Sequence, residues 1–110
     1  MELNLRCKLG HPRFVFRYFT TSIISGLSLE IVCTAFLSAV IFSTIGNESH
    51  FMSALSIGFV VFLGSIIAMP FTGGSMNPAR TLGPAVAYGE FKDIWMYFVG
   101  PIVGLSLIHI

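Results

Sequence analysis

Charged side chains are scarce in this chain, making up 10% of its 110 residues where a typical soluble domain has about 25%. No Asp, Glu, Lys or Arg occurs at residues 49–79 or 94–110, and Glu30 is the single charged residue at 18–47. Such long uncharged runs exclude an ordinary soluble fold. The net charge of +1 leaves no basic surface for nucleic acid, so no nucleic-acid partner is expected.

Cysteine and histidine are also too few and too scattered to build a reactive site. Cys7 and Cys33 do not read as a disulfide framework, because Cys33 lies inside an apolar run. The histidines at 11, 50 and 109 lack the spacing of a metal site, and no nucleophile is paired with a base. We therefore expect no metal, no cofactor and no enzymatic activity.

What the chain does contain is three apolar runs, at about residues 23–44, 52–69 and 94–110. A membrane span needs roughly 20 mostly apolar residues, so the third run is barely long enough. The pattern predicts an all-α transmembrane protein, with a basic lead at 1–22 and a membrane domain at 23–110. Within the third run, Gly100 and Gly104 have the spacing that permits close contact between helices.

The connector between the second and third runs contains its own helix signals. Asn77 is a good N-cap, Pro78 suits the first helical position, and Gly89 suits the terminator. A helix from 78 to about 88 would be only about 16 Å long, half a bilayer, with a bend expected at Pro84. We therefore predict a re-entrant loop and half-helix at about 71–88, rather than a fourth span.

The composition of this segment points to a water-filled pore. Irregular backbone at membrane depth persists only where it packs within protein or lines water. Gly73 and Gly74 allow unusual dihedral angles, and we expect the carbonyls of Gly73, Gly74 and Ser75 to line the pore as acceptors. Asn77, Arg80 and the helix dipole add donors and positive potential, which would accept the oxygen of a neutral solute and repel cations.

The segments TGGSMNPARTLGPAV and WMYFVGPIVG, with the span that carries Glu30, closely resemble the second half of the aquaporin (major intrinsic protein) family. The resemblance covers residues 31–104. A complete member has six spans and two half-helices with the Asn-Pro-Ala motif, so the resemblance implies that this chain is about half of a channel. It also implies a multi-pass membrane protein, expected in the plasma membrane, that pairs with a missing N-terminal half or a second copy and is a homotetramer when complete.

The resemblance implies roles for individual residues. The positions that match the pore motif are Asn77, Pro78 and Ala79. The positions that match the selectivity filter are Ser65, Gly74 and Arg80. Glu30 matches a buried glutamate that hydrogen-bonds the re-entrant backbone; the alternative is an interfacial residue whose carboxylate reaches water.

The signals for the solute are mixed. Thr81, Ala85, Tyr97 and Phe98 resemble the residues of water-specific channels. The small Ser65 and Gly74 instead favour a wider constriction, similar to the insect entomoglyceroporins that carry glycerol and urea; alternatively, Ser65 is a helix serine bonded to its own backbone. We expect a channel for water and small uncharged solutes, glycerol and urea included. The alternative function is a non-conducting membrane fragment or interaction subunit of a full aquaporin.

The family resemblance and the distribution of basic residues predict opposite orientations of the chain in the membrane. The resemblance places residues 1–22 outside and the connector at 43–50 in the cytoplasm. Four basic residues in the lead, and none in that connector, favour the reverse. The sequon that begins at Asn47 offers a check, because glycosylation there would mean an inverted orientation.

Overall fold

The computed structural model of the chain describes residues 22–46 and 50–109, which form four helices and no strand. The helices are α2 (Ile23–Thr44), α3 (His50–Thr72), α4 (Pro78–Tyr88) and α5 (Met96–His109). The predicted all-α fold is therefore confirmed for this part of the chain. The basic lead up to residue 21 and the sequon at 47–49 lie outside the described residues.

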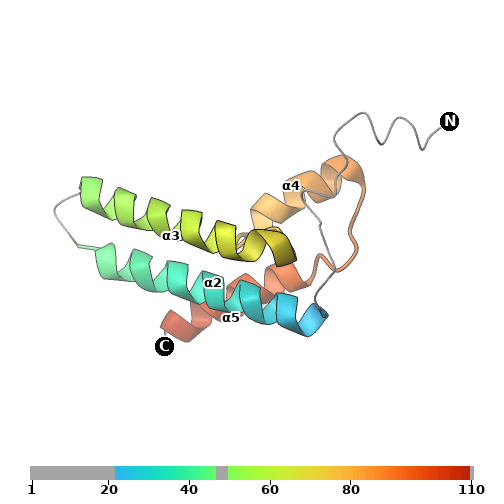
Figure 1. Cartoon of the computed structure of the whole chain (residues 1–110), viewed down its shortest axis with the longest axis horizontal. Coiled ribbons are helices and arrows are strands. Elements are labelled where there is room, and N and C mark those ends of the chain that lie inside the picture. The colour runs from blue at the N-terminus through green and yellow to red at the C-terminus, as the bar shows by residue number, and fades with distance from the viewer. Residues whose placement is uncertain (1–21, 47–49, 110) are drawn as a thin grey trace.

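α2 is the central helix of the arrangement. It packs against α3 on one side and α5 on the other, and α2 and α3 run antiparallel (Figure 1). α4 begins near the end of α3 and leads away from it, so the short loop at residues 73–77 sits where the long helices end. We call residues 73–77 the glycine loop.

α2 and α3 are long and apolar enough to cross a bilayer. α3 is longer than the expected span, because it continues through Pro70 to Thr72 instead of ending at residue 69.

Within the third apolar run the helix begins at Met96, two residues later than expected. The 14 residues of α5 up to His109 correspond to about 21 Å. The residues just before it form turns, in which the amide of Ile94 donates to the carbonyl of Phe91 and that of Met96 to Asp93. Asp93 has a φ of 53°, a left-handed conformation that stops a helix from extending through it.

Small residues bring α2 and α5 into close contact, as the spacing of Gly100 and Gly104 predicts. A Cβ added at Gly104 would lie 2.6 Å from the carbonyl oxygen of Ile31. One added at Gly100 would lie 2.8 Å from the Cβ of Glu30. The facing residues of α2 are buried at every fourth position: Gly26, Glu30, Thr34 and Ser38. This contact fixes Glu30 on the side of α2 that meets the other helices.

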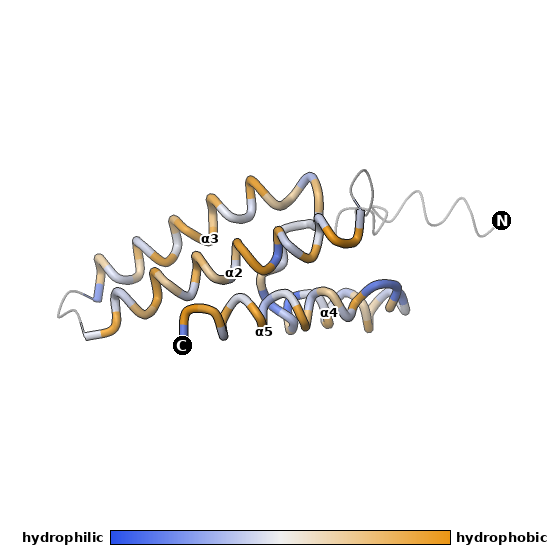
Figure 2. Tube along the Cα trace, turned by 90° about the horizontal axis from the view of Figure 1, so that it is seen from below, coloured by the Kyte–Doolittle hydropathy of each residue, from blue (hydrophilic) through white to orange (hydrophobic). Residues whose placement is uncertain are grey.

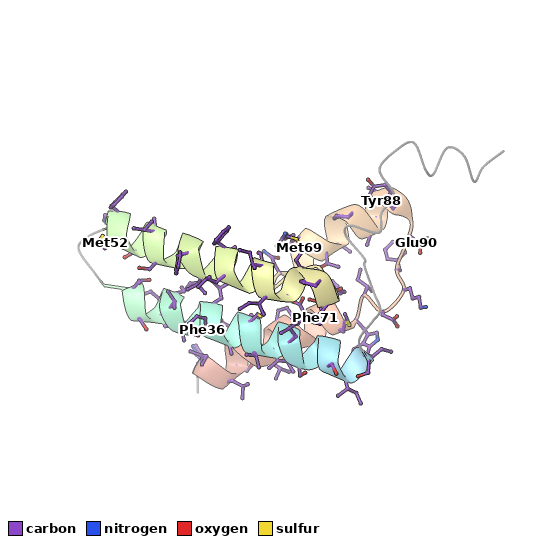
Figure 3. The ribbon with its side chains drawn as sticks, viewed as in Figure 1. Phe36, Met52, Met69, Phe71, Tyr88 and Glu90 are labelled. Atoms are coloured by element: carbon purple, nitrogen blue, oxygen red, sulfur yellow. The ribbon has the colours of Figure 1, made fainter. Side chains whose placement is uncertain are left out.

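The outer surface of the helices is apolar. Figure 2 shows hydrophobic and neutral residues along most of α2, α3 and α5, with few hydrophilic positions. Phe36, Met52 and Phe71 are 58%, 54% and 45% exposed, and Figure 3 shows them at the outside of α2 and α3. A surface of this kind suits lipid or another apolar protein surface rather than water.

Candidate functional site

The glycine loop has a left-handed backbone at three of its five residues. Gly73 and Gly74 have φ angles of 81° and 61°, which glycine adopts without steric cost. Met76 has a φ of 50°, which is uncommon for a residue with a side chain. Its amide donates to Oε2 of Glu30 at 2.8 Å, and its sulfur lies against Gly64 of α3. These two contacts hold Met76 in its strained conformation.

Glu30 anchors this loop from the middle of α2. Its side chain is completely buried, and Oε1 accepts hydrogen bonds from the Thr72 hydroxyl at 2.6 Å and the Ser75 amide at 3.2 Å. With the bond from Met76, the carboxylate accepts three hydrogen bonds, as its acceptor chemistry allows. The contact to the loop backbone is the one that the resemblance implies. The alternative, a carboxylate reaching water, does not fit a side chain with no exposed surface.

Thr72 and Tyr97 complete the anchoring and were missed by the sequence reasoning. The Thr72 hydroxyl accepts from the Gly74 amide at 3.3 Å while it donates to Glu30. The Thr72 carbonyl accepts from the hydroxyl of Tyr97 at 2.6 Å. Thr72 is the first residue of the TGGSMNPARTLGPAV segment, and Tyr97 was noted only for its resemblance to water-specific channels, which gives no indication of a bond to Thr72.

The start of α4 follows the local rules that predicted it. Oδ1 of Asn77 accepts from the amides of Ala79 and Arg80 at 2.9 and 3.4 Å. Pro78 has no amide hydrogen to satisfy, and Gly89 closes the helix with a φ of 69°. Because Oδ1 is occupied by the cap, the side chain of Asn77 presents its NH₂ group as a donor.

A pair of hydroxyls joins the glycine loop to the first turns of α4. Ser75 Oγ donates to the carbonyl of Asn77 at 2.8 Å and is also hydrogen-bonded to the hydroxyl of Thr81. A serine hydroxyl has one hydrogen, so in this pair Thr81 is the donor. The loop is therefore bound both to α2 and to the helix that follows it.

The structure brings Ser65, Gly74 and Arg80 together. Nη1 of Arg80 donates to the carbonyl of Gly74 at 2.7 Å. A Cβ added at Gly74 would lie 3.1 Å from the Cα of Ser65, so the glycine loop passes directly over α3 at this point. A cavity of about 130 Å³ lies beside Arg80, and its lining includes the hydroxyl-bearing residues Thr72, Ser75 and Thr81.

The chemistry of this site is that of hydrogen bonding to neutral groups. Arg80 has five donors, of which the bond to Gly74 uses one, and Asn77 adds its NH₂ group. α4 contributes the positive end of its dipole at the same place. Within residues 22–46 and 50–109, no group of three His, Cys, Asp or Glu side chains could hold a metal ion.

Comparison with known proteins identifies the same family as the sequence resemblance. A model of the major intrinsic protein family matches residues 10–109. Probable aquaporin TIP2-2 of Arabidopsis thaliana is 43% identical over 88 residues, which cover 76% of this chain and 35% of that protein. Aquaporin NIP1-1 of Zea mays is 40% identical over 106 residues, which cover 92% of this chain and 37% of that protein. The chain thus spans little more than a third of the length of these relatives.

Proposed function

Because the chain belongs to the major intrinsic protein family, we propose that it supplies one half of a membrane channel for water and small neutral solutes. The observation that carries this proposal is the convergence of Ser65, Gly74 and Arg80 beside the start of α4. Irregular backbone and a fixed cation are unfavourable in contact with lipid. A glycine loop followed by a short helix and an arginine is therefore expected at membrane depth only where it lines a path for polar solutes.

The proposed mechanism is an exchange of hydrogen bonds along the loop. A solute oxygen accepts from the Asn77 NH₂ group and from guanidinium donors of Arg80. The carbonyls of Gly73, Gly74 and Ser75 serve as acceptors for solute hydrogens. The orientation of the Gly74 carbonyl, which accepts from Arg80, supports this role. Each contact replaces one bond to water, so neutral molecules pass, while the positive charge of Arg80 opposes cations.

The function can be tested with a chimera in which this chain replaces the aligned residues of the Arabidopsis thaliana relative. We expect proteoliposomes to show osmotic water permeability, measured by stopped-flow light scattering, well above that of empty liposomes. Ser65→Trp should abolish the permeability, because Gly74 packs so closely on Ser65 that a bulky indole there would displace the glycine loop. Ser56→Trp, nine residues earlier on α3, is the matched control and should leave it unchanged. A correctly inserted chimera no more permeable than empty liposomes would contradict the proposal.

We extend the proposal to glycerol and urea on the basis of the small side chains at the constriction. Gly74 has no side chain, and Ser65 contributes a hydroxyl where a larger residue would narrow the passage. In the same chimera, Ser65→His should suppress glycerol and urea flux while it spares water. Unchanged glycerol flux would reject the role of Ser65.

The partners and location of the channel are part of the proposal. The pore would be completed by an N-terminal half or by a second copy of the chain, and the complete protein would be a homotetramer in the plasma membrane. These features rest on the family resemblance. Surface biotinylation of cells that produce the protein tests the location, and retention in internal membranes would overturn it.

The alternative function, an interaction subunit that packs on a complete channel without conducting, is favoured by the exposed apolar surface of α3. Phe51, Phe59 and Phe62 are 75%, 58% and 58% exposed. Co-expression with a complete relative, followed by cross-linking, separates the two functions. Cross-links to the relative without flux through the chimera would support the interaction subunit.

A further inference from the structure

Tyr97 connects α5 to the end of α3. Its side chain is 1% exposed, and its hydroxyl donates to the Thr72 carbonyl at 2.6 Å. Thr72 is the last residue of α3, and carbonyls in the last turn of a helix have no partner within it. α5 packs mainly on α2, so this tyrosine reaches beyond its own helix contact to satisfy a carbonyl of α3.

The bond from Tyr97 reaches the residue just before the two glycines. Thr72 is held at two points, since its carbonyl accepts from Tyr97 and its hydroxyl donates to Glu30. On the other side of the glycines, the amides of Ser75 and Met76 are held by the same carboxylate. Gly73 and Gly74 therefore span the space between an anchor before them and an anchor after them.

The position of the Gly74 carbonyl depends on both anchors. Glycine has the widest choice of backbone dihedrals, so two glycines in succession do not fix their own conformation. The Gly74 carbonyl in turn accepts from Nη1 of Arg80 at 2.7 Å. A shift of Thr72 would thus be passed through Gly73 and Gly74 to the guanidinium.

We infer that Tyr97 is a positioning residue for the constriction: by holding the Thr72 carbonyl it fixes Gly74 and Arg80, and so it determines which neutral solutes pass. The effect on solutes rests on the proposed function, whereas the effect on the loop does not require conduction. Tyr97→Phe removes the hydroxyl and keeps the ring. Tyr88→Phe is the matched control, because Tyr88 is 52% exposed and lies at the far end of α4 (Figure 3).

Hydrogen–deuterium exchange of the whole chain in lipid nanodiscs tests the effect on the loop. In Tyr97→Phe we expect the amides of residues 74–76 to exchange about two- to tenfold faster, the range that corresponds to the loss of one hydrogen bond. The amides of α2 should be unchanged, and Tyr88→Phe should match the unsubstituted chain. Unchanged exchange at 74–76 would overturn the inference. Faster exchange throughout α2 and α5 would also overturn it, since that result assigns Tyr97 to general stability.

Solute flux through the chimera tests the effect on selection. Tyr97→Phe should change the ratio of glycerol to water permeability by about two- to tenfold at equal protein content, while Tyr88→Phe should leave the ratio unaltered. An unaltered ratio in Tyr97→Phe would overturn the role in selection. If the unsubstituted chimera passes neither solute, the proposed function fails, and the exchange experiment still decides whether Tyr97 positions the loop.

Discussion

Glycine has different roles in two regions of this chain, the contact between α2 and α5 and the glycine loop. At the contact, Gly100 and Gly104 have ordinary helical conformations, and an added Cβ would lie 2.8 and 2.6 Å from atoms of α2. In the loop, Gly73 and Gly74 have φ angles of 81° and 61°. The first region requires only the absence of a side chain, whereas the second also requires freedom of the backbone.

The difference determines what each region tolerates. The loop accommodates Met76 at a φ of 50°, because Glu30 and Gly64 hold it there. The helix contact has no comparable freedom, since the atom closest to Gly104 is a backbone carbonyl oxygen that cannot turn aside. Substitutions in the contact should therefore cost the most, and the open glycines at helical φ, Gly58 and Gly83, should cost nothing when replaced.

The largest effect is expected for Gly104→Ala. The added methyl group would meet Ile31 O at 2.6 Å and Ala35 N at 3.0 Å, so α5 must move away from α2. We expect the free energy of unfolding to fall by about 3 kcal/mol, at the upper end for overpacking. Unfolding by SDS in mixed micelles, followed by the fluorescence of Trp95, measures this. Gly58→Ala is the control, because nothing lies within 4 Å of that position; equal losses in both variants would refute the prediction.

A smaller loss is expected for Glu30→Gln, which tests the anchor of the glycine loop. The amide keeps the shape of the side chain, but its NH₂ group must face donors: the Thr72 hydroxyl and the Ser75 amide if it takes the place of Oε1, or the Met76 amide if it takes the place of Oε2. One buried donor left unsatisfied costs about 2 kcal/mol. The same unfolding assay measures the loss. Glu90→Gln, in the exposed segment after α4 (Figure 3), should have no effect. A Gln variant as stable as the unsubstituted chain would show that the anchor is not needed.

Gly64→Ala should cost about 1 kcal/mol, because its neighbour is flexible. An added Cβ would lie 2.8 Å from Sδ of Met76, and a thioether can shift where a backbone cannot. In a Met76→Ala background the cost should largely disappear, so the two substitutions should be non-additive. Additive losses in a double-mutant cycle would mean that Gly64 and Met76 do not interact.

Gly83→Ala should be neutral or stabilising. Gly83 lies within α4, its φ is not positive, and nothing lies within 4 Å of an added Cβ. Replacing an open helix glycine by alanine adds about 0.5–1 kcal/mol of stability. Thermal unfolding in detergent, measured by circular dichroism, would detect the gain. A loss of stability would show that this side of α4 packs against protein.

The parts of the structure that local rules govern were predictable from the sequence. The predicted helix at 78–88 coincides with α4, because an N-cap, a proline at the first position and a terminal glycine act within a few residues. The place of Glu30 against the loop backbone came from the family resemblance. No local rule connects it to amides 45 and 46 residues later in the chain.

The contacts that depend on packing were not predictable. Tyr97 is 25 residues from Thr72, and its hydroxyl finds the carbonyl only because α2 places α3 and α5 on its two sides. The fit of Met76 against Gly64 depends on a left-handed residue that its sequence gives no reason to expect. α3 continues three residues past its expected end, with Pro70 inside it, and α5 begins two residues late, after the left-handed Asp93.

Glu30 holds the glycine loop by its backbone amides, and this has a consequence for how such proteins diversify. The amides of residues 75 and 76 are present with every side chain except that of proline. Mutation can therefore exchange side chains in the loop without removing these two bonds to α2. Because the bonds to Glu30 do not depend on side chains, substitutions in the loop can change which solutes are selected while the position of the loop backbone is kept.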